Sequence, residues 1–150
     1  MANKLKIAIL IDQLTPGGVQ KIAASEVKNL NNQGYRATLF ILTRLGYQKK
    51  YSLLVDDIPH IFLEDHFPKP LKKNFRLPFF AHLSIHHLLS PILAPGIIKK
   101  QNINIIVSHG TTTSFTALAV KKFAKIPYIL MIHDPMVYIL DKIYKKSPIY

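Results

Sequence analysis

The stretch IDQLTPGGVQKIAASEVKNLNNQGYRATLF, residues 11–40, decides the fold. It starts at the end of an apolar run, Lys4 to Ile11, whose length suits a buried strand. Gly17 and Gly18 then stand directly before a segment with helical periodicity. A plain connection needs no paired glycines. They favour either a tight turn with positive φ or a helix N-terminus at which a phosphate or carbonyl group approaches the backbone N–H groups, and the loop alone leaves both open.

The residues after the glycines predict a helix and then a second strand. Apolar side chains recur at helical spacing at Val19, Ile22, Ala23, Val27 and Leu30. Gly34 follows the last of them, at the place of a helix C-terminal cap. Tyr35 to Leu42 has the composition of a strand. Strand, glycine loop, helix and strand in this order predict a βαβ unit.

The rest of the chain continues to alternate between strand and helix patterns. Residues 43–57 suggest a loop with a short helix, and further strands are expected at Ile58–Leu63, Asn104–Val107 and Tyr128–Ile132. A helix between the last two has Phe115, Leu118, Ala119 and Phe123 at helical spacing and hydroxyl N-caps in Thr111 to Ser114, and a basic helix is expected over Met136–Lys146. The pattern predicts an α/β fold, with a parallel sheet flanked by helices in a single domain.

Leu77 to Ile98 contains no Lys, Arg, Asp or Glu, so a membrane span has to be considered. Pro78, Pro91 and Pro95 weigh against one. A helix that covers a face of the sheet, from about 79 to 89, explains the pattern better. An interfacial helix stays open as an alternative, because lysines and an arginine flank the segment on both sides and suit an anionic membrane surface.

Length and composition limit the class of protein. The chain has 150 residues, the size of one domain, and 49% of them are apolar, which suffices for a core. It contains no cysteine, so neither a disulfide framework nor a thiolate metal site exists. The apolar run after the basic N-terminus is too short for a signal peptide core and ends at Asp12. We therefore expect a cytoplasmic protein.

The formal net charge of +12 suggests a polyanionic partner. Phosphorylated small molecules, an anionic membrane surface and nucleic acid all fit this charge, and so does a compositional bias without functional meaning. Nucleic acid fits least well, because the lysines and arginines are scattered and no helix-turn-helix, OB or RRM signature occurs.

Three polar clusters follow predicted strands directly. They are Asp12 to Gly18, Ser108 to Thr113, and His133 with Asp134. In a parallel α/β sheet, ligands bind beyond the carboxyl ends of the strands. Because all three clusters fall on that edge, they are the candidate site. The fingerprint G-x-G-x-x-G and the P-loop lysine pattern are both absent, which disfavours a nicotinamide-dependent oxidoreductase.

The histidines at these ends are the candidate reactive groups. His109 and Gly110, followed by Thr112, open a helix, and imidazole, hydroxyl and N–H groups there suit a sugar hydroxyl or a phosphate; a helix-capping role is the plain alternative. His133 is predicted to face the ligand, while Asp134 caps the next helix or makes a second contact, since neighbours on an extended chain point to opposite faces. His82, His86 and His87 lack an H-E-x-x-H frame, so no metal site is predicted.

Two segments together resemble the N-terminal domain of family 4 glycosyltransferases of the GT-B fold. The first is ILIDQLTPGGVQKIAASEVKNLNNQGYRATLFIL, which is similar to that family's strand, Gly-Gly loop, long helix and second strand. The second is NIIVSHGTTTSFTALAVKKFAKIPYILMIHDP, which is similar to its histidine-glycine strand end, its small-residue helix, its G-[IV]-P turn and its His-Asp strand end. The region 43–100 shows no detailed match.

The resemblance implies a Rossmann-like domain that binds the acceptor of a retaining transferase using a nucleotide-sugar donor, with no cofactor and no obligatory metal. It implies that Gly17 and Gly18 approach the donor diphosphate, that His133 lies beside the transferred sugar as the catalytic residue, and that His109 lies beside the acceptor. Gly110, Thr112 and Asp134 complete the implied substrate-binding set.

The resemblance also implies a missing part. The family carries a Glu-x7-Glu element on a second, donor-binding domain, and nothing in this chain matches it. We therefore expect the chain not to transfer sugar alone. The alternative is a non-catalytic module that binds phosphosugars or a membrane and partners a separate donor-domain chain. The acceptor would be a glycan or a lipid-linked glycan, and a peripheral place on the inner face of the membrane would suit it.

Overall fold

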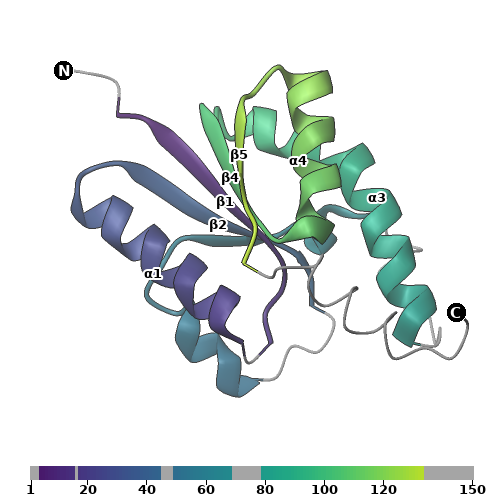
Figure 1. The fold of residues 1–150 in the computed structure, drawn as a ribbon, viewed down its shortest axis with the longest axis horizontal. Coiled ribbons are helices and arrows are strands. Elements are labelled where there is room, and N and C mark those ends of the chain that lie inside the picture. The colour runs from purple at the N-terminus through teal and green to yellow at the C-terminus, as the bar shows by residue number, and fades with distance from the viewer. Residues whose placement is uncertain (1–3, 16, 45–48, 69–78, 134–150) are drawn as a thin grey trace, which may run out of the picture.

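The computed structural model describes residues 4–15, 17–44, 49–68 and 79–133 (Figure 1). The predicted helix over 136–146 and the candidate residue Asp134 lie outside these ranges. The strands are β1 (Lys6–Gln13), β2 (Arg36–Thr43), β3 (His60–Phe62), β4 (Ile105–His109) and β5 (Tyr128–Met131). The α-helices are α1 (Gly18–Asn32), α3 (Phe79–Lys100) and α4 (Thr111–Ala124), and the short 3₁₀ helices are η1 (Lys49–Leu54) and η2 (Leu63–His66).

The strands form one five-stranded sheet in the order β3-β2-β1-β4-β5, and every neighbouring pair is parallel. The predicted α/β class and Rossmann-like parallel sheet are thus confirmed. From β1 the chain proceeds outward to β2 and β3, and then returns through α3 to place β4 on the other side of β1. The carboxyl ends of β1 and β4 therefore form the topological switch point, the usual place of a ligand site in such sheets.

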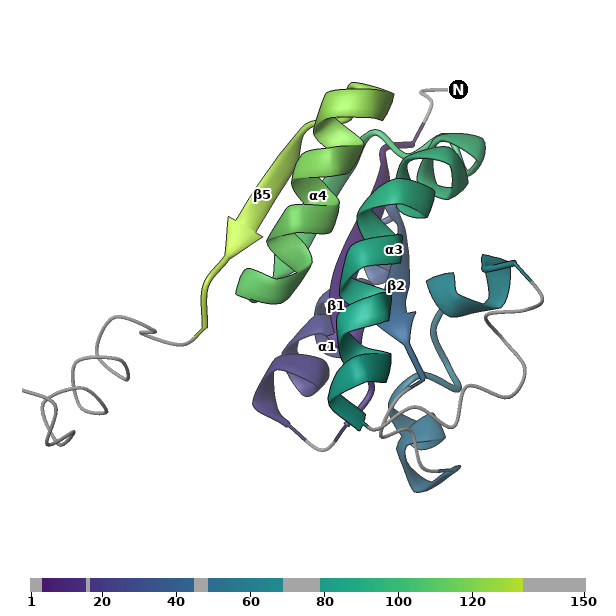
Figure 2. The same ribbon diagram turned by 90° about the vertical axis from the view of Figure 1, so that its right-hand side faces the viewer.

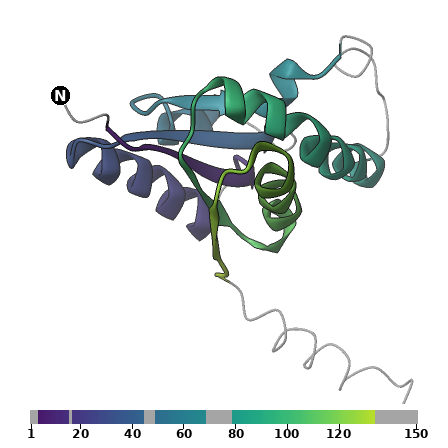
Figure 3. The same ribbon diagram turned by 90° about the horizontal axis from the view of Figure 1, so that it is seen from above.

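Helices cover both faces of the sheet, α1 on one and α3 with α4 on the other (Figures 1 and 2). In the view from above, the sheet lies between the layer of α1 and the layer formed by α3 and α4 (Figure 3). The alternating residues of β1 explain this arrangement, because successive side chains of a strand point to opposite faces. Ile7, Ile9 and Ile11 pack in the cluster that includes Ala23 and Val27 of α1. Ala8 and Leu10 pack in the cluster that includes Ala94 of α3 and Ala117 of α4.

The predicted C-terminal cap of α1 is confirmed. Gly34 has φ +88, and its N–H donates to the carbonyl of Asn31 while the N–H of Tyr35 donates to that of Leu30. These two bonds define a Schellman motif, which requires the left-handed backbone that glycine adopts without strain. The cap fixes the direction in which the chain leaves α1 and enters β2.

The helix predicted from 79 to about 89 is longer than expected. It continues as α3 through Pro91 and Pro95 to Lys100. The two prolines stand one turn apart, so the positions without N–H donors lie on the same side of the helix. Ala94 and Ile98 are fully buried in the core under α3, and this packing holds the C-terminal half in place. The prediction that this helix covers the sheet is confirmed. Among the described residues, no helix is long and apolar enough to cross a membrane.

The apolar residues whose spacing predicted α4 lie on its outer surface and not against the sheet. Phe115, Leu118 and Phe123 are 70%, 51% and 66% exposed. The buried side of α4 instead consists of small and β-branched residues, namely Thr113, Thr116, Ala117 and Val120. The expected hydroxyl N-cap is also wrong, since the N-cap is Gly110 and it makes no side-chain capping bond. The described part of the chain therefore exposes large apolar side chains on this helix.

Candidate functional site at the carboxyl edge of the sheet

The loops after β1 and β4 are joined at the switch point. Thr112, in the first turn of α4, donates its hydroxyl to Oδ2 of Asp12 at 3.3 Å. The other carboxylate oxygen of Asp12 accepts the N–H of Gln13 at 2.7 Å. Asp12 lies at the end of β1 and therefore connects this strand to the helix that follows β4. Two of the predicted polar clusters thus meet at one edge, as the parallel topology requires.

The two glycines at the start of α1, Gly17 and Gly18, do not form a positive-φ turn. Gly17, the N-cap of α1, has an extended backbone with φ −164, and Gly18 is likewise absent from the positive-φ glycines of the described residues. A Cβ at Gly17 would lie 2.3 Å from Oε1 of Gln20, so the Gln20 amide occupies that place. A Cβ at Gly18 would meet nothing within 4 Å. Neither a positive φ nor packing in the folded chain requires glycine at position 18.

His109 is buried and forms hydrogen bonds through both ring nitrogens. Its Nδ1 lies 2.7 Å from Nε2 of His133, and its Nε2 lies 2.8 Å from Oε2 of Glu26. The His109 ring is completely shielded from solvent, whereas the Glu26 side chain is 30% exposed. The three side chains come from β4, from the residues just after β5 and from α1. They form one hydrogen-bonded row at the carboxyl edge.

Strand register explains why the two histidines meet. His109 is the Cα partner of Met131 in the parallel pair β4–β5. His133 follows Met131 by two residues, and side chains two positions apart on an extended chain point to the same face. The rings lie almost in one plane, with an interplanar angle of 12° and centroids 4.9 Å apart. With the nitrogens 2.7 Å apart, this is the geometry of an in-plane hydrogen bond rather than of face-to-face stacking.

The turn from β4 into α4 is built on a glycine conformation. Gly110 has φ +92 and ψ 163, a region essentially restricted to glycine. Its N–H donates to the carbonyl of Met131 at 2.9 Å, which ties the turn to β5. The Thr113 hydroxyl lies 2.9 Å from the His109 carbonyl and 2.7 Å from the Ser108 hydroxyl. These bonds hold the backbone of His109 from both sides.

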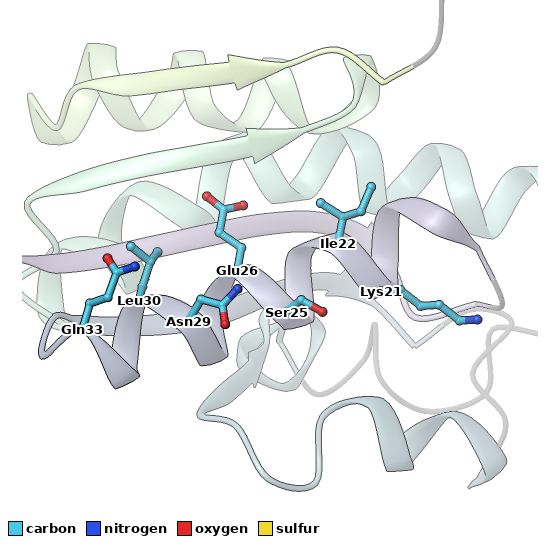
Figure 4. Close-up of a pocket in the computed structure, with 7 residues that line it drawn as sticks. All are labelled: Lys21, Ile22, Ser25, Glu26, Asn29, Leu30 and Gln33. Atoms are coloured by element: carbon cyan, nitrogen blue, oxygen red, sulfur yellow. The ribbon is translucent and has the colours of Figure 1, made fainter.

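Sequence reasoning missed Glu26. It lies on the third turn of α1 beside the buried stripe that contains Ala23 and Val27. Figure 4 shows its carboxylate directed from α1 toward the strands. Glu26 is one of the residues that line a pocket of about 540 Å³. The signal available in the sequence was an acidic residue at the border of an apolar helix stripe. That signal does not reveal which strand residue the carboxylate meets.

No group of three His, Cys, Asp or Glu side chains in the described ranges is arranged to hold a metal ion. The predicted site residues Gly17, Gly18, His109, Gly110 and Thr112 all lie at the carboxyl edge of the sheet, with His133. Their assignment to substrate binding or catalysis stays a prediction.

Comparison with known proteins adds the fold class. No protein family matches the sequence, and no curated protein sequence does. Among solved structures, TcCGT1 in complex with UDP superposes with a TM-score of 0.65 at 12% identity, covering 97% of this chain and 33% of that one. A glycosyltransferase from Rickettsia africae gives 0.53 at 21% identity, covering 97% and 34%. The C-terminal domain of the PF1911 hydrogenase from Pyrococcus furiosus gives 0.60 at 15% identity, covering 85% and 91%.

These likenesses show the fold and no more, because every identity is low. The fold is a Rossmann-like α/β domain, of the kind that glycosyltransferases of the GT-B fold contain. The chain spans about a third of the length of the glycosyltransferase chains it matches.

Proposed function

We propose that the chain is the acceptor-side domain of a retaining glycosyltransferase, which transfers a sugar from a nucleotide-sugar donor to a glycan or lipid-linked acceptor. The observation that carries this proposal is the pairing of His109 with His133 at the switch-point edge, next to the loop that joins β1 to α1. The fold shared with glycosyltransferases and the resemblance of the two sequence segments support it. The hydrogenase domain shares the fold too, so the proposal rests on the site.

The proposed roles follow the chemistry of the edge. The first N–H groups of α1, at Gly17 and Gly18, carry partial positive charge and suit the donor diphosphate. His133 takes the catalytic position beside the transferred sugar, and His109 lies behind it. Thr112 and Asp134 are proposed as contacts to substrate hydroxyls. No cofactor and no metal ion are assigned a role.

The test is a transfer assay with a donor-binding domain present. The coding sequence beyond the codon for Tyr150 shows whether such a domain follows in the same polypeptide, and otherwise a separately encoded domain is added. We expect sugar transfer from a nucleotide sugar only when both domains are present. Absence of transfer with every nucleotide sugar and donor domain tried, together with phosphosugar binding by the chain, would instead favour the non-catalytic module.

A Gly18→Ala variant separates a structural from a ligand-related role of this glycine. We expect the free energy of unfolding to rise by about 0.4–1 kcal/mol, because alanine restricts the unfolded chain and meets no atom in the folded one. Binding of the donor to the completed enzyme should weaken, since the methyl group would stand beside the N–H groups proposed to meet the diphosphate. Chemical denaturation and donor titration measure the two effects, and unchanged donor affinity would contradict the role of Gly18.

A membrane surface is a second candidate partner, favoured by the outer surfaces of α3 and α4. These two helices pack together on one face of the sheet. Among the side chains that the structure describes, Leu88, Ile92, Phe115, Leu118 and Phe123 are large, apolar and exposed on these helices. Lys121, Lys122 and Lys125 are exposed on and after α4. Apolar side chains mixed with lysines suit the interface of an anionic bilayer, which is where a lipid-linked acceptor would be found.

We expect the chain to bind vesicles containing anionic lipid and to release them as salt is raised, since salt screens the attraction of exposed lysines. A Phe115→Ser variant should bind more weakly, whereas Asn29→Ser on the opposite face of the sheet should bind like the wild type. Vesicle co-sedimentation measures both. Equal binding to neutral vesicles at high salt would contradict the electrostatic part of this proposal.

A further inference from the structure

Glu26, His109 and His133 are joined by two hydrogen bonds. Each neutral imidazole has two ring nitrogens but only one N–H, so the bonds determine which nitrogen carries the proton. His109 is shielded from solvent, and among the described residues its two nitrogens have only Glu26 and His133 as partners. A glutamate carboxylate accepts hydrogen bonds and has none to donate. The 2.8 Å contact therefore requires that Nε2 of His109 carries the proton. A neutral imidazole has a single N–H, so Nδ1 of a neutral His109 must accept.

The same reasoning extends to the second ring. If Nδ1 of His109 accepts, the 2.7 Å contact requires that Nε2 of His133 donates. A neutral His133 then has its lone pair on Nδ1, and among the described residues this nitrogen has no hydrogen-bond partner. We propose that Glu26 is a positioning residue that fixes the tautomer of both histidines and so presents the unprotonated Nδ1 of His133 as the hydrogen-bond acceptor of the site.

This arrangement gives the row a defined response to one proton. A proton that arrives at Nδ1 of His133 turns this nitrogen from an acceptor into a donor. The proton on Nε2 of His133 can pass along the 2.7 Å bond to Nδ1 of His109, which places the imidazolium beside the Glu26 carboxylate. That the arriving proton comes from a substrate hydroxyl rests on the proposed function, whereas the tautomers themselves do not.

The carboxylate of the row belongs to Glu26 of α1, and it meets His109. Glu26 reaches His109 from another layer of the fold, because α1 covers the sheet face on which Val107 and His109 of β4 lie. Of the lysines on its own helix, Lys21 lines the same pocket, and Lys28 is paired with Asp57 at 2.6 Å. The described contacts therefore leave the Glu26 carboxylate to His109.

NMR spectroscopy can determine which imidazole nitrogens of His109 and His133 carry protons. The ¹⁵N chemical shifts of the imidazole nitrogens distinguish protonated from unprotonated nitrogens, and they are recorded at alkaline pH, where imidazole is neutral. For the wild-type chain we expect Nε2 protonated and Nδ1 unprotonated in both His109 and His133. In Glu26→Gln, the isosteric amide can accept or donate, so we expect signals of the reversed tautomers to appear beside the original ones. In Glu26→Leu, which removes the acceptor, we expect a mixture as well.

Asn29→Leu is the matched control, because Asn29 lines the same pocket on α1 and is not among the described hydrogen-bond partners of the two histidines. It should give the wild-type spectrum. A wild-type His109 protonated on Nδ1, or a Glu26→Gln spectrum with the same single tautomer as the wild type, would overturn the inference. Because the spectra are recorded without donor or acceptor, failure of the glycosyltransferase assay leaves this result unaffected, and the reverse also holds.

Discussion

Replacing His133 by alanine is expected to lower the rate of sugar transfer by about 10²–10⁴-fold, the usual range for a positioned acid–base group. Its ring is partly buried at the end of β5, and its bond to His109 directs Nδ1 away from that partner. The fold should persist, because within the described ranges the His133 side chain makes one hydrogen bond, of the kind that contributes about 1 kcal/mol. The measurement is initial rate against nucleotide-sugar concentration for the polypeptide that includes a donor-binding domain.

The control for His133→Ala is His60→Ala. His60 is exposed at the amino end of β3, and its Nδ1 lies 3.1 Å from the carbonyl of Ile58. Its removal should leave transfer unchanged. If His133→Ala retains the wild-type kcat while its KM rises, His133 contributes to binding alone, and the catalytic assignment is wrong. If both variants lose activity in parallel with stability, the effect comes from the fold and not from the site.

The order of elements could be predicted from the sequence because each strand and helix carries its own local signal. The apolar run of β1, the periodicity of α1 and the cap at Gly34 all depend on residues close in the chain. The parallel sheet follows from their alternation, and so does the gathering of His109 and His133 at one edge. These predictions needed no knowledge of which side chains touch.

The errors and omissions have a common physical origin, which is packing between distant segments. Pro91 and Pro95 signal a helix end locally, but burial of Ala94 and Ile98 stabilises the helix beyond them. The spacing of Phe115, Leu118 and Phe123 predicted the helix correctly without revealing which side packs on the sheet. The sequence does not identify Glu26 as a site residue, because its contact with His109 depends on how α1 packs on the sheet. Positions set by tertiary contacts override local propensity in each case.

Gly110→Ala is expected to destabilise the chain by about 1–3 kcal/mol, the usual cost of placing a side chain in a backbone region restricted to glycine. A Cβ at this position would meet no atom within 4 Å, so the cost comes from the conformation, φ +92 and ψ 163, and not from a clash. Since proteins of this size are stable by about 5–15 kcal/mol, the loss is readily measured by chemical denaturation.

Gly96→Ala is expected to raise stability, whereas Gly110→Ala lowers it. Comparing the two variants shows that the loss in Gly110→Ala comes from the backbone conformation. Gly96 lies inside α3, where φ is negative, and a Cβ there also meets nothing within 4 Å. Alanine should stabilise this helical site by about 0.5–1 kcal/mol. Equal effects of the two substitutions would contradict the conformation of the β4–α4 turn. In that turn the N–H of Gly110 donates to the Met131 carbonyl and the hydroxyl of Thr113 donates to the His109 carbonyl. Relaxation of the strain in Gly110→Ala should therefore also displace the histidine pair. The ¹⁵N signals of His109 and His133 should therefore change in Gly110→Ala and stay unchanged in Gly96→Ala.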